Sequence, residues 1–200
     1  MVEFDYDFDF ILENDIVLLR PLSKDDFKDL LPFALTEPGL WKYSLIQASG
    51  EEGMKNYIEQ AIRGRTERKE YAFTVLDKRT NEFAGSTRFY DIQLFHETLQ
   101  LGYTWYGKKF QGTRLNKNCK YLLLEFAFEH KNFKRVEFRA DHNNERSIAA
   151  MKSIGCTEEG VLRSNVIKSD GGRRDSIVLS ILREEWLGNI KKMLGNKCVG

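Results

Sequence analysis

The pattern of hydrophobic and polar positions predicts strands in several parts of the chain. Alternation of apolar and polar residues, or a short β-branched and aromatic run between turn residues, is typical of a strand. Such patterns occupy residues 15–20, 70–77, 82–92, 99–105, 134–140, 158–168 and 173–182, with turns expected at 78–81 and 169–172. Within the fourth segment Leu99, Leu101, Tyr103 and Trp105 alternate, so we expect these four side chains on one side of a sheet.

Apolar residues spaced three and four positions apart predict the helices. We expect helices at about 24–35, 51–68, 115–130, 144–155 and 184–194, and a loop at 36–45. The helix at 115–130 is the most apolar, and one face carries Leu115, Cys119, Leu122, Leu123, Phe126 and His130. Helices alternate with strands in the middle of the chain and hairpins lie at either side, which predicts a mixed sheet with helices on both faces.

Composition narrows the class of protein. The chain has 200 residues, 42% apolar and 30% charged, and no linker or repeat, so we expect a single domain over residues 1–200 with a sizeable core. The acidic, aromatic start is unlike a secretory signal, and no apolar run is long enough to span a membrane. Three widely spaced cysteines, Cys119, Cys156 and Cys198, favour unpaired thiols and a cytoplasmic location.

Positive charge is concentrated in one place, although the net charge of +1 argues against a general nucleic-acid binder. No acidic residue lies between Glu97 and Glu125, where the chain carries Lys108, Lys109, Arg114, Lys117 and Lys120. Cations at a helix N-terminus are disfavoured unless an anion compensates them, so we favour an anion site at the turn 107–114 over a merely solvated helix start. Gly112 would let an anion approach the backbone closely. The glycine motifs of nucleoside triphosphatases and dinucleotide-binding folds are absent.

Two motifs resemble a known family. The sequence K-K-F-Q-G-T-R-L-N-K opens the apolar helix, and N-E-R-S-I-A-A-M-K-S-I-G-C follows some thirty residues later. Together with the order of elements over about residues 13–185, they resemble the GNAT superfamily of acetyl-CoA-dependent N-acetyltransferases. The branch that contains the ribosomal-protein alanine N-acetyltransferases is the most similar. The resemblance implies a three-layer α/β fold: a mixed, mostly antiparallel sheet of about seven strands, in which two central parallel strands, 99–105 and 134–140, splay apart.

The resemblance also implies how acetyl-CoA binds. The family holds the pyrophosphate on a loop written [QR]-x-x-G-x-[GA], here residues 109–114, with Lys109 in place of Gln or Arg and Arg114 in place of Gly or Ala. Arg114 either contacts a cofactor phosphate or crowds the loop. The implied cofactor-binding residues are Tyr103, Trp105, Lys109, Gln111, Gly112, Thr113, Arg114, Asn116 and Asn144.

For the chemistry, the resemblance implies that Ser147 protonates the leaving thiolate, because Met151 stands where many relatives have a tyrosine. The alternative for Ser147 is a helix residue bonded to a carbonyl one turn earlier. The general base stays open among Glu97, Glu137, Asp141 and a water chain. The acceptor side has candidate walls in Trp41, Tyr43 and Tyr90, and Asp175 is assigned to a hairpin contact or to the acceptor. The three histidines lack ligand spacing, so no metal is expected.

The leading hypothesis is an N-acetyltransferase that moves the acetyl group directly to a primary amine of a protein N-terminus or a small molecule. We expect no nucleic-acid or membrane partner, and a monomer or homodimer. A second hypothesis is a non-catalytic acyl-CoA-binding or sensor module, motivated by Arg114, Met151 and the unassigned base. A third is a nucleic-acid-binding domain that uses the basic stretch, which predicts binding that weakens steeply with salt.

Overall fold

A computed structural model describes residues 2–199 and contains an eight-stranded sheet. The strand order is β1-β2-β3-β4-β5-β6-β8-β7, and every neighbouring pair is antiparallel except β5 and β6, which are parallel. The bounds are β1 Leu12–Glu13, β2 Val17–Pro21, β3 Glu70–Asp77, β4 Glu82–Gln93, β5 Thr98–Tyr106, β6 Arg135–Asp141, β7 Thr157–Ile167 and β8 Arg173–Leu182. The expected mixed, mostly antiparallel sheet is confirmed, with the short β1 as an additional strand.

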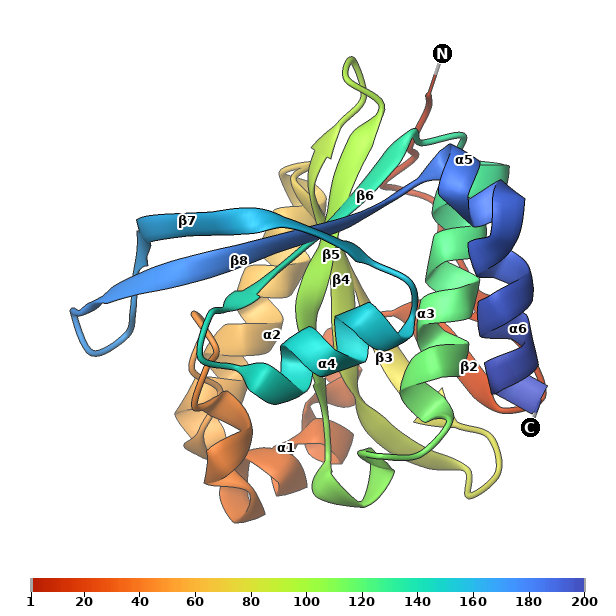
Figure 1. Ribbon diagram of the computed structural model, residues 1–200. Coiled ribbons are helices and arrows are strands. Elements are labelled where there is room, and N and C mark those ends of the chain that lie inside the picture. Colours follow the sequence, from red (N-terminus) through yellow and green to blue (C-terminus); the bar gives the residue numbers. More distant parts are fainter. Residues whose placement is uncertain (1, 200) are drawn as a thin grey trace.

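Helices cover both faces of this sheet (Figure 1). Their bounds are η1 Lys24–Asp26, α1 Phe27–Thr36, η2 Pro38–Trp41, α2 Gly50–Thr66, η3 Lys108–Phe110, α3 Leu115–Glu125, η4 Phe126–His130, α4 Glu145–Ser153, α5 Arg183–Glu185, η5 Trp186–Ile190 and α6 Lys191–Val199. Among residues 2–199, none of these helices has the length and apolar character needed to cross a membrane.

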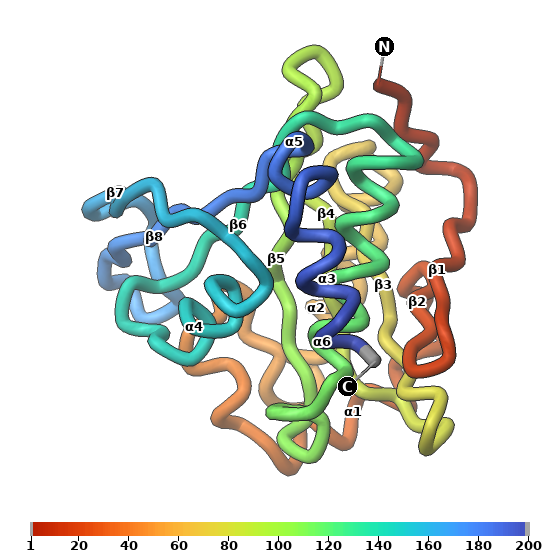
Figure 2. The backbone as a smooth tube through the Cα atoms, turned by 45° about the vertical axis from the view of Figure 1, so that its right-hand side comes forward, coloured from red at the N-terminus to blue at the C-terminus, as the bar shows by residue number. Residues whose placement is uncertain are grey.

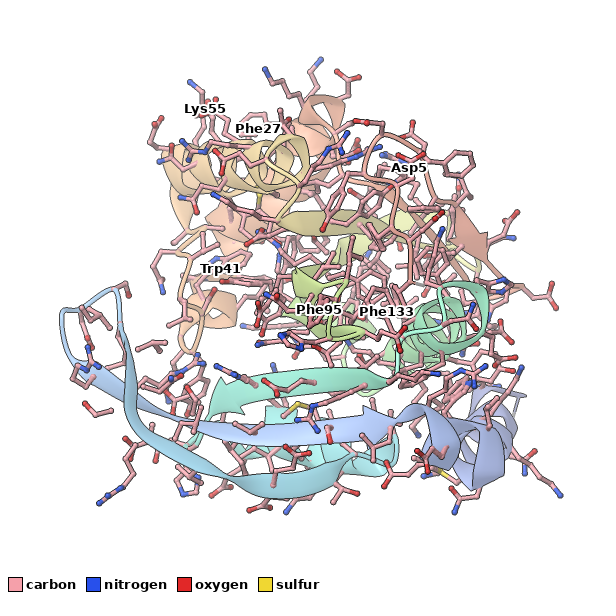
Figure 3. The ribbon with its side chains drawn as sticks, turned by 90° about the horizontal axis from the view of Figure 1, so that it is seen from above. Asp5, Phe27, Trp41, Lys55, Phe95 and Phe133 are labelled. Atoms are coloured by element: carbon pink, nitrogen blue, oxygen red, sulfur yellow. The ribbon has the colours of Figure 1, made fainter. Side chains whose placement is uncertain are left out.

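Two hydrophobic cores lie on opposite faces of the sheet. One is formed by α1 and α2, with Ala72 and Trp105 from the sheet; we call this side the α2 face. The other is formed by α3 and α6, which lie side by side in Figure 2, together with α4 and the segment before β1; we call this side the α3 face. Figure 3 shows Phe27 and Trp41 on the α2 face and Phe133 beside the helical turn that follows α3.

The two central parallel strands separate along their length, as expected. They pair over three positions, Thr98 with Arg135, Leu99 with Val136 and Gln100 with Glu137. Beyond these pairs β5 continues to Tyr106 and β6 to Asp141 without pairing with each other. We call the region where β5 and β6 no longer pair the splay.

The expectation that β5 presents four alternating residues on one side is wrong. Leu99 and Leu101 pack in the α3-face core, whereas Trp105 packs in the α2-face core and Tyr103 contacts Arg88 and Tyr90. The reason is a β-bulge, in which Tyr103 and Thr104 face the single residue Thr87 of β4, and Tyr103 has φ +48°. A bulge inserts one residue and reverses the side to which later side chains point.

The long apolar helix also departs from its predicted pattern at the end. After Glu125 the chain forms the π-helical turn η4, and His130 is exposed instead of sharing the buried face. A π turn holds more residues than an α turn, so the helical phase shifts and a spacing-based assignment fails there.

Candidate active site

The turn between β5 and α3 forms a cradle of free backbone donors. Gly112 has φ +73°, and a Cβ atom built on it would meet no other atom within 4 Å. Among the described residues, the N–H groups of Gly112, Thr113, Asn116 and Lys117 donate to no protein atom. Unpaired N–H groups at a helix start that follows a left-handed glycine are suited to an anion.

Side chains stiffen this turn and tie it across the splay. Thr113 Oγ1 donates to Phe110 O at 2.7 Å and accepts from Leu115 N–H at 3.2 Å. Gln111 donates through Nε2 to Tyr106 O at 2.7 Å, and its Oε1 accepts from the Arg146 guanidinium of α4. Gln111 therefore links the element after β5 to the element after β6, on the two sides of the splay.

The basic residues that the sequence groups together separate in the structure. Lys109 forms an ion pair with Glu82 at 2.5 Å, so its ammonium is engaged by the start of β4. Arg114 is exposed at the start of α3, whereas Lys120 is only 5% exposed. Assigning Lys120 to the basic surface of the turn was wrong, because its side chain lies on the face of α3 that packs against the sheet and reaches Thr104.

Lys120 lies beneath the bulge on the α3 face. Its ammonium donates to Thr104 Oγ1 at 2.8 Å and lies 5.9 Å from the ring centre of Phe138 in β6, so it contacts both walls of the splay. No carboxylate lies within 4.0 Å of it among the described residues. Burial lowers the pKa of Lys120 to about 8, and nearby Cys119 and Cys156 act in the opposite direction.

Helix α4 places Asn144 and Ser147 after β6. Asn144 caps the helix, and its Oδ1 accepts from Ser147 N–H at 3.2 Å. The Ser147 hydroxyl makes no hydrogen bond among the described residues, so the bond to a carbonyl one turn earlier is not formed. By contrast, Ser153 Oγ on the same helix donates to Ala150 O at 2.7 Å. Met151, at the position of the relatives' tyrosine, is buried in the core.

The three candidate carboxylate bases differ in their surroundings. Glu137 is held by Arg135 at 2.9 Å and by Arg139 at 2.7 Å. Asp141 is buried and accepts from Asn143 N–H at 2.9 Å. Glu97 lies in the turn before β5, at the opposite end of that strand from Gly112. Asp175 has the hairpin contact, since its Oδ1 accepts from Ser164 N–H at 2.7 Å.

On the α2 face, Tyr103 of the bulge packs among aromatic and charged side chains. Its ring meets Tyr90 edge to face at 4.9 Å and lies 4.6 Å from the guanidinium carbon of Arg88. Arg88 has no exposed surface and pairs with Glu70 at 2.6 Å. Burial raises the pKa of Tyr103, which Arg88 and Arg174 partly oppose. The sequence did not identify Arg88 or Arg174, because both stand in ordinary strand patterns.

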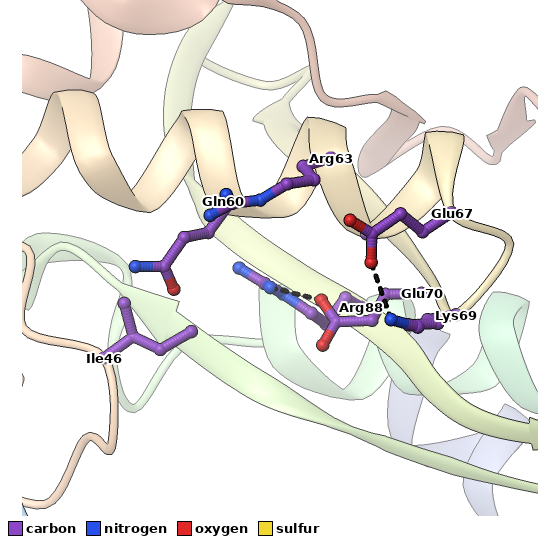
Figure 4. Close-up of a pocket in the computed structure, with 8 residues that line it drawn as sticks. Ile46, Gln60, Arg63, Glu67, Lys69, Glu70 and Arg88 are labelled. Carbon is purple, nitrogen blue, oxygen red and sulfur yellow. Dashed lines mark hydrogen bonds and ion pairs between the residues drawn. The ribbon is translucent and has the colours of Figure 1, made fainter.

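A pocket of about 200 Å³ lies beside this group. Arg88 and Glu70 line it together with Gln60 of α2 and Ile46 of the preceding loop (Figure 4). Trp41 is 1% exposed and packs against Trp105 at 4.9 Å, so it forms a local core instead of an open wall. Tyr43 is half-buried, with the Lys42 ammonium 5.0 Å from its ring centre.

Several known proteins are similar to this chain in sequence. The chain is 25% identical over 182 residues to "Uncharacterized N-acetyltransferase p20" of Bacillus licheniformis, covering 88% of this chain and 98% of that protein. It is 30% identical over 104 residues to "Putative ribosomal N-acetyltransferase YdaF" of Bacillus subtilis, covering 52% of this chain and 56% of that protein.

Solved structures share the fold. The crystal structure of a "putative acetyltransferase" from T. thermophilus has 33% identity and a TM-score of 0.85, covering 95% of this chain and 97% of that one. Mycobacterium smegmatis RimJ in complex with CoA-disulfide has 18% identity and a TM-score of 0.79, covering 94% and 93%. The similarity to YdaF confirms the predicted resemblance to the branch that contains ribosomal N-acetyltransferases. Because residues 17–157 match the acetyltransferase (GNAT) domain, the chain belongs to the GNAT family and is an N-acetyltransferase.

Proposed function

We propose that this protein transfers the acetyl group of acetyl-CoA directly to a primary amine, either a protein N-terminal α-amine or a small-molecule amine. The observation that carries the proposal is the splay, which connects the amide cradle at Gly112 with the α2 face at Tyr103. Acetyl-CoA supplies an acetyl group activated as a thioester. We assign acetyl-CoA to the Gly112 side of the splay and the acceptor amine to the α2 face. The amine then attacks the thioester directly, without a covalent enzyme intermediate, and the fixed orientation of the two reactants lowers the barrier.

The residues present fit the cofactor. The free N–H groups of Gly112, Thr113, Asn116 and Lys117 suit a pyrophosphate, and we assign Arg114 to a cofactor phosphate. Gln111 holds the turn in shape through Tyr106 O, and the Asn144 amide borders the arm of the cofactor. The bulged backbone at Tyr103–Trp105 orients the thioester carbonyl. Lys109 contributes a contact only when it leaves Glu82.

Ser147 is the group we assign to the leaving thiolate. Its side chain is half-buried, and its hydroxyl has no hydrogen-bond partner in the described part of the chain, whereas the hydroxyl of Ser153 donates to Ala150 O. A positioned hydroxyl of this kind acts mainly in the transition state, when charge develops on sulfur. We assign the removal of the proton from the acceptor amine to water, because the carboxylate of Glu137 is bound by two arginines and that of Asp141 by Asn143.

The test is release of free thiol from acetyl-CoA with a panel of amines and peptides that have free N-termini. We expect turnover with at least one acceptor and a product that carries one acetyl group on nitrogen. The alternative is a non-catalytic acyl-CoA sensor, which the buried Met151 at the usual donor position favours. Binding of acetyl-CoA without thiol release across the panel would establish that alternative.

Cofactor binding is measured separately by thermal unfolding. Acetyl-CoA at a hundredfold over its dissociation constant stabilises the fold by about 2.7 kcal/mol. No shift at millimolar acetyl-CoA contradicts the proposal. We also propose a cytoplasmic location, which the three unpaired cysteines among the described residues support.

A further inference from the structure

Arg174 of β8 is a buried cation that the proposed chemistry does not use. It is 8% exposed, and its one hydrogen bond among the described residues runs from Nε to Ser176 Oγ at 3.1 Å. Within residues 2–199, its two terminal nitrogens have no protein acceptor, and no carboxylate oxygen lies within 4.0 Å of them. The charge of Asp141 acts on Arg174 from a longer distance. Its terminal nitrogens are not among the fully enclosed unpaired side-chain atoms of the described residues, so a ligand can reach them.

The position of Arg174 relates it to the reaction centre. Ser176, two residues further along β8, pairs with Asp141 at the end of β6, so Arg174 lies beyond the wide end of the splay. Along β8, Arg174 and Ser176 alternate with Ile177 and Leu179, which pack in the α3-face core, so Arg174 points to the opposite side of the sheet. Arg174 thus faces the α2 face, which is the side we assign to the acceptor.

The α2 face has a surplus of hydrogen-bond donors. Four buried side-chain N–H positions there lack an acceptor among the described residues: Trp41 Nε1, Trp105 Nε1, Arg88 Nε and Arg88 Nη2. The side chains form one continuous group, because Arg88 lies 4.9 Å from the ring of Tyr57, which packs against both tryptophans. These four donors are enclosed and do not contact a ligand themselves, but their N–H dipoles add positive potential to the region.

The other arginines near Tyr90 and Tyr103 are already neutralised. Arg88 is paired with Glu70 at 2.6 Å, and Arg139 is paired with Glu137 at 2.7 Å. Arg174 is therefore the cation of this group that has no ion pair with any residue that the structure describes. A single unpaired guanidinium with two free terminal nitrogens matches one carboxylate, which accepts two parallel hydrogen bonds.

We propose that Arg174 binds a carboxylate that the acceptor carries close to its reactive amine. The preferred acceptors are then free amino acids or peptides with an acidic residue next to the N-terminus. Arg88 is too enclosed to contact the acceptor itself, and it positions Tyr103 and Glu70. The inference rests on the proposed function, because it names the class of amine that the same site acetylates.

The kinetic test uses two pairs of acceptors that differ in one charge. One pair is L-alanine and L-alaninamide. The other is two C-terminally amidated peptides with the same sequence, starting Ala-Asp or Ala-Asn. We expect kcat/KM for the charged member of at least one pair to be about ten- to a hundredfold higher, the usual range for hydrogen bonds to a charged group.

Variants of β8 identify the residue responsible. Arg174→Gln should bring the ratio of the two kcat/KM values to about one, and Arg174→Lys should keep part of the preference because the charge remains. Arg173→Gln is the matched control, since Arg173 is exposed and bonds to Ser164 instead of facing the splay. The control should keep the parent ratio. A parent without preference for the charged members, or a preference that survives Arg174→Gln, overturns the proposal.

A binding test separates this proposal from the proposed function. N-Acetyl-L-alanine and the acetylated Ala-Asp peptide, each compared with its neutral counterpart, are added to the parent and to Arg174→Gln in thermal unfolding. We expect at least one charged product to raise the Tm of the parent and not of Arg174→Gln. If product binding follows the charge but no acceptor releases thiol from acetyl-CoA, the proposed function fails and the carboxylate site stands. Equal shifts in parent and variant refute the carboxylate site.

Discussion

Two regions of the molecule present hydrogen-bond donors without acceptors, and they are built in different ways. The turn at Gly112 has backbone N–H groups from one short segment, and the α2 face has side-chain donors from Arg88, Trp105 and Arg174, of which we assign only Arg174 to a ligand. The backbone set depends on the path of the chain and hence on one residue with positive φ. The side-chain set depends on strands far apart in sequence. The donors of the Gly112 turn should therefore survive most side-chain substitutions in that segment. On the α2 face, each substitution of a donor residue removes that donor.

The largest effect of a single substitution is expected at Gly112, whose backbone conformation positions the N–H groups of the turn. Valine strongly disfavours φ +73°, so Gly112→Val should reorient the N–H groups of the turn although no protein atom blocks the new side chain. Loss of two hydrogen bonds to a phosphate weakens acetyl-CoA binding roughly a thousandfold, or about 4 kcal/mol. Calorimetric titration with acetyl-CoA measures the effect.

The matched control is Gly171→Val in the turn between β7 and β8. Gly171 has φ +82° and the same open surroundings, so the variant carries similar backbone strain away from the site. Both variants should lose similar stability, and the control should keep the parent affinity. Equal affinities for Gly112→Val and Gly171→Val would refute the assignment of the turn.

Lys120 tests whether the basic residues near the turn share one environment. The sequence groups it with the turn, and the structure places it in the core. Its folded pKa is about 8 and its ordinary value is 10.5, so between these values the unfolded chain holds a proton that the folded chain has lost. The contribution of Lys120 to the free energy of unfolding therefore rises with pH across this window, and its cost is largest below pH 8. Over the window the change amounts to about 3 kcal/mol.

Lys120→Met should remove this rise, so the stability of the variant relative to the parent falls by about 3 kcal/mol between pH 7 and pH 10. Urea unfolding at a series of pH values measures it. Lys117→Met removes a charge from the same helix outside the core and serves as the control. Parallel pH profiles for the parent and Lys120→Met would show that the buried amine does not titrate in this range.

The smallest of these effects is expected at Ser147 of α4. Ser147→Ala should lower kcat about ten- to a hundredfold with acetyl-CoA affinity nearly unchanged, because its hydroxyl acts on charge that develops during the reaction. Ser147→Cys should recover part of the loss if proton donation is what counts. Ser153→Ala controls for the helix, since that hydroxyl bonds to Ala150 O. A parent rate in Ser147→Ala, with chemistry rate-limiting, would leave the thiolate to water.

Local pattern accounts for what the sequence predicted. Strand β3 spans the residues expected for it, and α2 and β8 fall within two residues of their predictions, because periodicity and turn residues act over a few positions. The turn at Gly112 was found for the same reason. The splay came from the family resemblance, since no local pattern states where two strands stop pairing.

What the sequence missed depends on long-range contacts. The bulge that turns Tyr103 to the α2 face forms against Thr87 of β4, and strict alternation in β5 concealed it. Arg88 and Arg174 read as polar positions of ordinary strands, because their burial is created by residues from other strands and from α2. Lys120 read as surface charge because helical spacing alone does not give the angle of the sheet beneath it.

The three residue pairs between β5 and β6 have a mechanical consequence. The strands β1 to β5 form one half-sheet and β6, β8 and β7 form another. Among residues 2–199, strands β5 and β6 pair only at one end of this boundary. The two half-sheets are thus joined by a short run of paired residues at one end. At the other end, the hydrogen bond from Arg146 to Gln111 connects them. A ligand bound in the splay contacts both half-sheets. The relative motion of the half-sheets therefore decreases as the fraction of protein with bound ligand increases.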